Sequence, residues 1–170
     1  GEFGVFYKGF AKYYSGWNHN GIHIVDTLSF LFSSDIKIKR INDSFDSPYD
    51  NDPTLDLDLV LDRDEGIIHV NSVDEEHYQI FEFDLLFSDY RLKIEDFGLK
   101  IRLEKREVNK NGENVLVESD PHLVTDSRSA IQNAVELIVM SINENDTRKL
   151  EGMLLEDIYP TMRTIWSVKR

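Results

Sequence analysis

The sequence predicts an α+β domain built around an open-faced, mainly antiparallel β-sheet with helices packed on one face. Three observations lead to this prediction: apolar residues recur at helical spacing near both ends of the chain, apolar and polar residues alternate between them, and tight turns separate the alternating runs. Such alternation indicates a sheet with one covered and one polar face, and we expect about six to eight strands.

The first strand and helix are predicted between residues 5 and 32. Residues 5–14 carry apolar and aromatic side chains on both sides of the pleat, which favours a strand covered on both faces. Residues 16–21 interrupt that pattern, and residues 22–32 resume it at helical spacing, with Ile24 and Leu28 on one stripe. A polar turn therefore joins a strand to a buried helix, where a rigid scaffold can present side chains to a ligand.

The middle of the chain predicts the strands of a meander. Leucines between positions 55 and 61 alternate with aspartates, and an Asn-Gly pair at 111 signals a hairpin turn. Residues 42–53 carry four aspartates and two prolines, so we expect a mobile acidic loop outside the sheet, with solvated charges. Helical spacing returns in residues 131–142 and 155–166, the second of which contains Pro160.

Composition argues against several classes of function. The 170 residues include 32 acidic and 19 basic side chains and no cysteine, for a net charge of −13. This charge repels phosphate backbones and no basic stripe offsets it, so we expect no nucleic-acid partner. The absence of cysteine excludes disulfides and cysteine-ligated metals. The longest apolar run is far shorter than the roughly 20 residues that span a bilayer, and no signal peptide is evident, so we expect a cytoplasmic protein without membrane contact.

Residue spacing indicates no cofactor or metal site in this chain. No set of glycines has the G-x-G-x-x-G or Walker spacing, so the chain is not expected to hold a dinucleotide itself. The aspartate-rich stretch 50–65 lacks the calcium-loop pattern. His19 and His23 have the spacing of the zinc motif H-E-x-x-H, but residue 20 is Asn and no third ligand is evident. We therefore predict neither metal ligands nor cofactor-binding residues here.

The stretch 16–26, Gly-Trp-Asn-His-Asn-Gly-Ile-His-Ile-Val-Asp, resembles the start of the C-terminal domain of a dehydrogenase family. This is the glucose-fructose oxidoreductase, inositol dehydrogenase and rhizopine catabolism protein family, called Gfo/Idh/MocA. Gly21, His23 and Asp26 occupy the family's motif positions, whereas His19 stands where the family has an acid. A weaker resemblance covers most of the chain, including its last helix.

The resemblance implies that residues 1–170 form one substrate-binding and oligomerisation domain, with an N-terminal Rossmann domain absent from this chain. That missing domain would hold NAD or NADP and contribute a lysine, so this fragment alone is expected to fold without turning over substrate. The family moves a hydride between a nicotinamide and a hydroxyl-bearing carbon of a sugar, inositol or sugar nucleotide. His23 is then the catalytic residue, since an imidazole with a pKa of about 6.5 can take the hydroxyl proton near neutral pH. Substrate-binding residues would be Trp17, Asn18, His19, Asn20 and Asp26.

Several alternatives remain open at this point. His19 could bind a substrate hydroxyl, Asn18 or Asn20 could take over the orienting contact of the missing acid, or the protein could have left dehydrogenase chemistry. His23 could instead be a core histidine bonded to backbone. The chain could be a non-catalytic relative whose sheet serves as a subunit interface or a carbohydrate-binding surface, or a free-standing ligand-binding module. In each case the polar sheet face is a candidate surface for homo-oligomer formation, because a broad, flat sheet is a ready interface.

Overall fold

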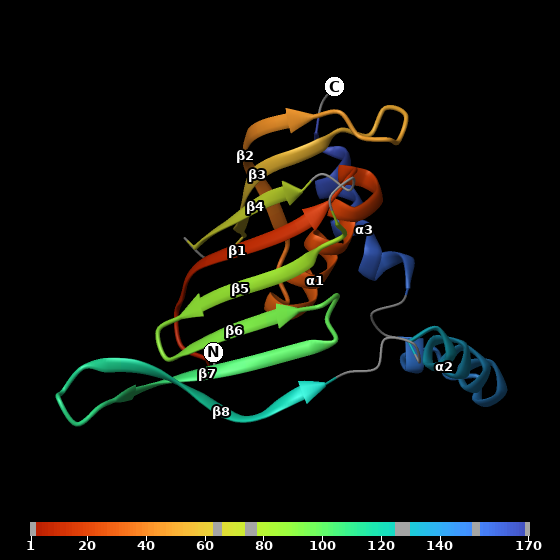
Figure 1. Ribbon diagram of the computed structural model, residues 1–170. Coiled ribbons are helices and arrows are strands. Elements are labelled where there is room, and N and C mark those ends of the chain that lie inside the picture. The colour runs from red at the N-terminus through yellow and green to blue at the C-terminus, as the bar shows by residue number, and fades with distance from the viewer. Residues whose placement is uncertain (1–2, 63–65, 74–77, 125–129, 151–153, 169–170) are drawn as a thin grey trace.

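The computed structural model describes residues 3–62, 66–73, 78–124, 130–150 and 154–168 (Figure 1). Within these residues, one sheet contains eight strands in the order β2-β3-β4-β1-β5-β6-β7-β8. The strands are β1 (Phe6–Tyr14), β2 (Ile36–Phe45), β3 (Thr54–Leu61), β4 (Ile67–Val73), β5 (Phe81–Phe87), β6 (Tyr90–Glu95), β7 (Lys100–Val108) and β8 (Asn114–Val124). The helical elements are the π-helical turn η1 (Trp17–Gly21), α1 (Ile22–Phe32), α2 (Ala130–Glu144), the short η3 (Thr147–Leu150) and α3 (Leu155–Trp166). The predicted α+β class with an open, mainly antiparallel sheet is confirmed.

Strand β1 lies in the middle of the sheet, although it comes first in the chain. It pairs in parallel with β4 and antiparallel with β5, and Ala11 faces Val70 on one side and Phe83 on the other. At Gly9 a Cβ atom would come within 2.8 Å of the Leu85 side chain, so glycine lets the neighbouring strand pack closely. The other strand pairs in the described residues are antiparallel.

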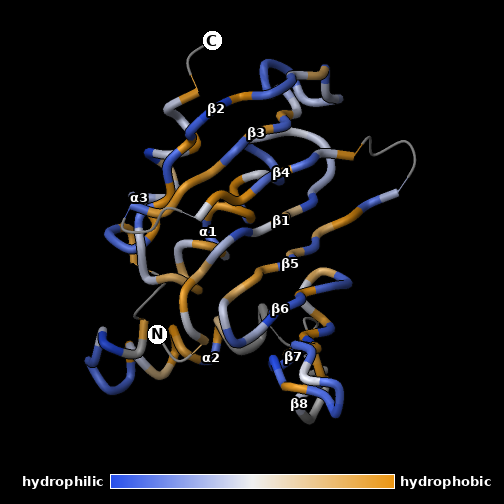
Figure 2. Tube along the Cα trace, turned by 90° about the vertical axis from the view of Figure 1, so that its left-hand side faces the viewer, coloured by the Kyte–Doolittle hydropathy of each residue, from blue (hydrophilic) through white to orange (hydrophobic). Residues whose placement is uncertain are grey.

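The core lies between one face of the sheet and the helices α1 and α3. Helix α1 contributes Ile24, Val25 and Leu28, and α3 contributes Ile165, all buried. The sheet contributes alternate residues, which include Leu55, Leu57, Leu59, Leu61, Ile68, Val70, Phe83 and Leu85. Figure 2 shows the resulting alternation of hydrophobic and hydrophilic positions along the strands. Burial of this apolar surface is the main force that holds the helices on the sheet.

The opposite face of the sheet is open and polar. Lys12 pairs with Glu82 at 3.2 Å, and Arg91 donates two hydrogen bonds to the Asp84 carboxylate. These bonds from Arg91 hold the pKa of Asp84 below its ordinary value. Phe10 is 40% exposed on this face, so the prediction that β1 is covered on both faces is wrong. A register shift between Phe6 and Lys8 places Phe6 in the core instead.

The acidic interval 42–53 differs from its prediction in two respects. Strand β2 extends to Phe45, which faces Thr54 of β3, so residues 42–45 belong to the sheet. The remaining loop carries Asp52, whose side chain is buried and hydrogen-bonded where a solvated charge was expected. The reason is long-range packing, because the β2–β3 hairpin folds its loop against the end of β1.

The last third of the chain is helical, as predicted. Helix α3 continues through Pro160, and α2 is set apart from the two helices that cover the sheet (Figure 1). Helix α2 carries exposed apolar side chains at Val135, Leu137, Ile138, Val139, Met140 and Ile142. None of the helices in the described ranges has the length and apolarity needed to cross a membrane.

Candidate functional site

The stretch singled out in the sequence forms the end of β1, the turn η1 and the first turn of α1. Gly21 N and Asn20 N both donate to the carbonyl oxygen of Gly16, at 3.1 and 2.9 Å, and the bond from Gly21, which spans five residues, makes η1 a π-type turn. Gly16 has a φ of 78°, and a Cβ atom there would lie 2.7 Å from both Asp52 and Tyr49. Only glycine combines this backbone angle with so close an approach. Single π turns within helices are frequently found at functional sites.

The side chain of Trp17 packs against this turn from the core. Its indole is 1% exposed, and its Nε1 donates to the carbonyl oxygen of Ile165 at 3.3 Å. The ring also meets Tyr13 edge-on and fills the space beneath Gly21, where a Cβ atom would come within 2.2 Å of it. Trp17 was expected to contact substrate, but it lies in the core, where an apolar ring with one polar handle is well placed to anchor a turn.

Asp52 organises the first residues of η1. One carboxylate oxygen accepts hydrogen bonds from the backbone N and the side-chain Nδ2 of Asn18, at 2.7 and 2.8 Å. The other accepts from the backbone N of His19 at 3.0 Å. The carboxylate is therefore the acceptor for two amides at the start of a helical segment, the place where a negative charge is most favourable. The amide of Asn20 is likewise used internally, because its Nδ2 donates to the Ser15 carbonyl oxygen at 2.5 Å.

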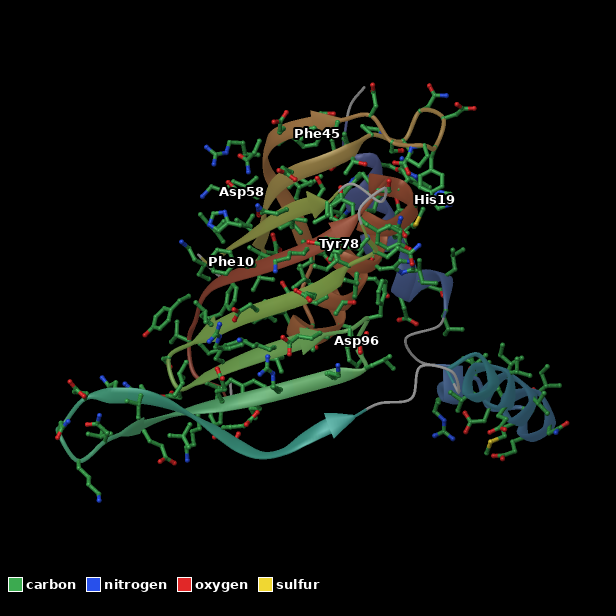
Figure 3. The ribbon with its side chains drawn as sticks, in the orientation of Figure 1. Phe10, His19, Phe45, Asp58, Tyr78 and Asp96 are labelled. Carbon is green, nitrogen blue, oxygen red and sulfur yellow. The ribbon has the colours of Figure 1, made fainter. Side chains whose placement is uncertain are left out.

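The imidazole of His19 is stacked on the ring of Tyr49 and lies at the surface. The two ring centroids are 3.8 Å apart with an interplanar angle of 4°. The His19 side chain is 62% exposed, and its Nδ1 lies 4.0 Å from the Asp52 carboxylate. Figure 3 shows His19 close to the loop that joins β2 and β3, on the side away from Asp58 and Phe10.

His23 is the second residue of α1, and its side chain is exposed. Its ring meets Phe81 of β5 edge-on at 6.5 Å. The alternative interpretation of His23 as a core histidine is therefore wrong. Asp26, one turn later, is also exposed, and it accepts a hydrogen bond of 3.5 Å from the Thr161 hydroxyl of α3. The first turn of α1 thus presents an imidazole and a carboxylate to solvent from a fixed scaffold.

A second polar cluster lies on the open face of the sheet. The Asp58 carboxylate is 2.8 Å from both Arg40 Nη2 and His69 Nδ1, and it accepts from Asn42 Nδ2 at 3.1 Å. Burial acts to raise the pKa of Asp58, but the hydrogen bonds from His69, Asn42 and Arg40 outweigh burial and hold the pKa below its ordinary value. In the described part of the chain, no three His, Asp or Glu side chains are grouped so as to hold a metal ion.

Sequence reasoning missed Asp52, Tyr49 and Asp58. Asp58 could have been found, because strand pairing sets it opposite Arg40 on β2 and His69 on β4. For Asp52 and Tyr49 the sequence carries no comparable signal, since they come from a loop rich in acids and prolines.

Solved structures share this fold at low sequence identity. Dehydrogenase MviM from Clostridium difficile matches with a TM-score of 0.59 and 11% identity, covering 96% of this chain and 54% of its own. The UDP-N-acetylglucosamine 3-dehydrogenase GnnA from Acidithiobacillus ferrooxidans matches with a TM-score of 0.54 and 10% identity, covering 97% and 52%. KijD10, a 3-ketoreductase from Actinomadura kijaniata in complex with NADP, matches with a TM-score of 0.60 and 10% identity, covering 96% and 50%. No protein-family model and no curated protein matches the sequence.

These matches define a class of protein through its fold, an α+β domain of the kind that oxidoreductases carry. The matched structures are named as dehydrogenases and a 3-ketoreductase, and this chain shares their fold. The resemblance first noted at residues 16–26 is thereby confirmed for the fold. The chain spans about half the length of the solved structures that it matches.

Proposed function

We propose that this chain is the substrate-binding domain of an NAD(P)-dependent oxidoreductase that acts on a hydroxyl of a sugar, inositol or sugar nucleotide. The observation that carries the proposal is the exposed His23 imidazole at the start of α1, in a fold shared with dehydrogenases. GnnA is named as a dehydrogenase of a sugar nucleotide, and KijD10 is named as a 3-ketoreductase. Both names support a hydroxyl or ketone as the reacting group.

In this proposal His23 takes the proton of the substrate hydroxyl, and Asp26 and Asn18 contribute polar groups around the same turn. The NAD(P) nicotinamide, when bound, accepts the hydride from the hydroxyl-bearing carbon. This chain has no glycine-rich phosphate loop, so the dinucleotide is expected to bind to a separate Rossmann domain of the same protein. By the same argument, the 170-residue chain alone binds NAD(P) weakly or not at all.

Replacement of His23 tests the role of the imidazole. In the full-length protein, His23→Ala should reduce turnover by about two to four powers of ten, the usual contribution of general acid-base catalysis. Because the His23 side chain is exposed, the variant should unfold at the same temperature as the unsubstituted protein. Turnover close to that of the unsubstituted protein would remove His23 from the mechanism.

A non-catalytic, carbohydrate-binding relative is the second candidate. His19 stands where the family has an acid, and the open face carries a hollow of about 370 Å³ lined by Phe10, Lys12, Asn71 and Glu82 among others. An aromatic ring beside charged and amide groups suits a sugar. A G-x-G-x-x-G loop and a Glu-Lys-Pro motif upstream in the gene would favour the enzyme, and a gene that lacks both would favour this second candidate.

We also propose that the open sheet face mediates self-association. This face is broad, and Tyr7 and Phe10 are exposed on it beside the ion pairs of Lys12 and Arg91. Aromatic and arginine side chains are enriched in protein interfaces.

A further inference from the structure

The first backbone amides of a helical segment have no partner within it and need an acceptor from outside. In η1 these amides belong to Asn18 and His19, and both donate to the Asp52 carboxylate, at 2.7 and 3.0 Å. The acceptor lies more than thirty residues further along the chain, in the loop between β2 and β3. Asp52 thus caps this segment from a distance, as an N-cap residue does from within.

The Asp52 carboxylate is itself held in place. Its side chain is buried, the Ser47 hydroxyl donates to its carbonyl oxygen at 2.5 Å, and its backbone N donates to the Tyr49 carbonyl oxygen at 3.3 Å. Two further bonds join the same segments, because Trp17 N donates to the Pro53 carbonyl oxygen at 2.8 Å and Gly16 N donates to the Thr54 hydroxyl at 2.9 Å. The loop and the turn are therefore one hydrogen-bonded unit.

This unit is continuous with the helix that carries His23. Turn η1 ends at Gly21 and α1 begins at Ile22, so no residue separates the turn from the helix. His23 lies in the first turn of α1, and its direction follows from the direction of η1. Anything that fixes the amides of Asn18 and His19 also fixes the backbone from which the His23 side chain projects.

We propose that Asp52 is a positioning residue for His23, acting through the η1 turn. The proposal rests on the proposed function, in which His23 is the proton acceptor. The Asp52 carboxylate reaches the turn from the β2–β3 loop. Asp52 lies 4.0 Å from His19 Nδ1, so the negative charge beside the turn is supplied from there.

The experiment compares Asp52→Asn with Asp50→Asn by NMR in the 170-residue chain. Both variants remove one negative charge from the same loop, but Asp50 is exposed, and the bonds to Asn18 and His19 come from Asp52. In Asp52→Asn one carboxylate oxygen becomes an NH₂ group, which donates hydrogen bonds and accepts none. The side chain then cannot accept from both amides as the carboxylate does. We expect the Asn18 and His19 amides to exchange with solvent about tenfold faster or more, since their protection depends on that acceptor. We also expect the ring contact between His23 and Phe81 to change.

The NMR results for the two variants distinguish a positioning role of Asp52 from a local capping role. Faster amide exchange together with an altered His23 ring environment in Asp52→Asn, but not in Asp50→Asn, supports the proposal. Unchanged amide exchange overturns it, and so does faster exchange with an unaltered His23 ring, because Asp52 would then be a local cap only. If Asp52→Asn does not fold, Asp52→Glu serves instead. Its longer side chain keeps the negative charge but displaces the carboxylate from the amides of Asn18 and His19, and faster exchange of these amides with an unaltered His23 ring counts against the proposal.

An activity measurement separates this proposal from the proposed function. In the full-length protein, Asp52→Asn should lower kcat about tenfold or more with a smaller effect on KM, and Asp50→Asn should change neither, because a misplaced base loses rate more than binding. Full turnover in His23→Ala would disprove the proposed function, whereas the NMR result would still decide whether Asp52 positions the turn. Loss of turnover in His23→Ala with normal kcat in Asp52→Asn would overturn only the positioning role.

Discussion

The indole nitrogen of Trp17 donates a hydrogen bond to the carbonyl oxygen of Ile165, across almost the whole length of the chain. The turn that leads into α1 is thereby joined to the last helix, and Asp26 and Thr161 make a second link between the same two helices. The candidate site therefore depends on residues from both ends of the sequence.

This link predicts a large loss of stability in Trp17→Ala. Removing a fully buried tryptophan costs about 3–5 kcal/mol in the free energy of unfolding, because packing is lost and a cavity remains. Trp166→Ala is the matched control, since Trp166 is 66% exposed and should change stability by about 0.5 kcal/mol or less. Denaturant titration of both variants measures the difference, and equal losses would show that Trp17 does not anchor the turn.

Tyr13 predicts a loss of stability at alkaline pH. Its hydroxyl donates to the Leu55 carbonyl oxygen and accepts from Leu55 N, and burial raises the pKa of the phenol above its ordinary value. The unfolded chain ionises Tyr13 at a pH of about 10 and the folded chain does not, so stability falls as the pH rises above about 10. Tyr13→Phe should lose this part of the pH dependence. It should also cost about 1–3 kcal/mol at neutral pH, because the polar groups of Leu55 lose their partner. An unchanged alkaline profile in the variant would contradict this account.

Asp58 predicts a loss of stability in acid. The pKa of its carboxyl is held below its ordinary value in the folded chain, so its contribution is present above a pH of about 4 and is lost as the pH falls further. Asp58→Asn should be less stable than the unsubstituted protein at pH 7, and the difference should shrink in acid. Asp46→Asn, at an exposed loop position, is the control and should show neither effect. A constant difference at every pH would assign the loss to packing.

The open sheet face predicts that Phe10→Lys weakens self-association. A positive charge in place of the exposed ring would have to be buried on contact, which is costly without a partner charge. Phe30→Lys makes the same change on α1, where Phe30 is 82% exposed, and should leave self-association unchanged. Analytical ultracentrifugation over a range of concentrations measures both. A chain that stays monomeric at every concentration would rule out this interface.

The periodicity of apolar residues was sufficient to predict the sheet and the helices. In nearly every strand apolar and polar residues alternate, because only one face of the sheet has to be buried. It was not sufficient for β1, where the irregularity beside Phe6 moves one aromatic ring from the open face to the core. Trp17 illustrates a related limit. A tryptophan in a polar turn is equally compatible with binding and with anchoring, and only its contact with Ile165 distinguishes the two.

Part of the candidate site was proposed from the sequence. His23 and Asp26 came from a local motif, and both side chains are exposed, while their roles stay predictions. Asp52 and Tyr49 could not be identified from the sequence. Their side chains are placed by the β2–β3 hairpin folding against η1, and the composition of the loop does not indicate that packing. The site residues on α1 are close together in the sequence, whereas those in the β2–β3 loop come from a distant part of the chain.

The central position of β1 has a consequence for how the protein is made. Its partner strands β4 and β5 follow it by more than fifty and more than sixty residues, so β1 leaves the ribosome long before its neighbours exist. Until Val73 has been synthesised, the aromatic strand that bears Tyr7 and Phe10 has two unpaired edges, and one edge stays unpaired until Phe87 follows. Such an exposed nascent strand is the segment of this chain that a chaperone would have most reason to bind.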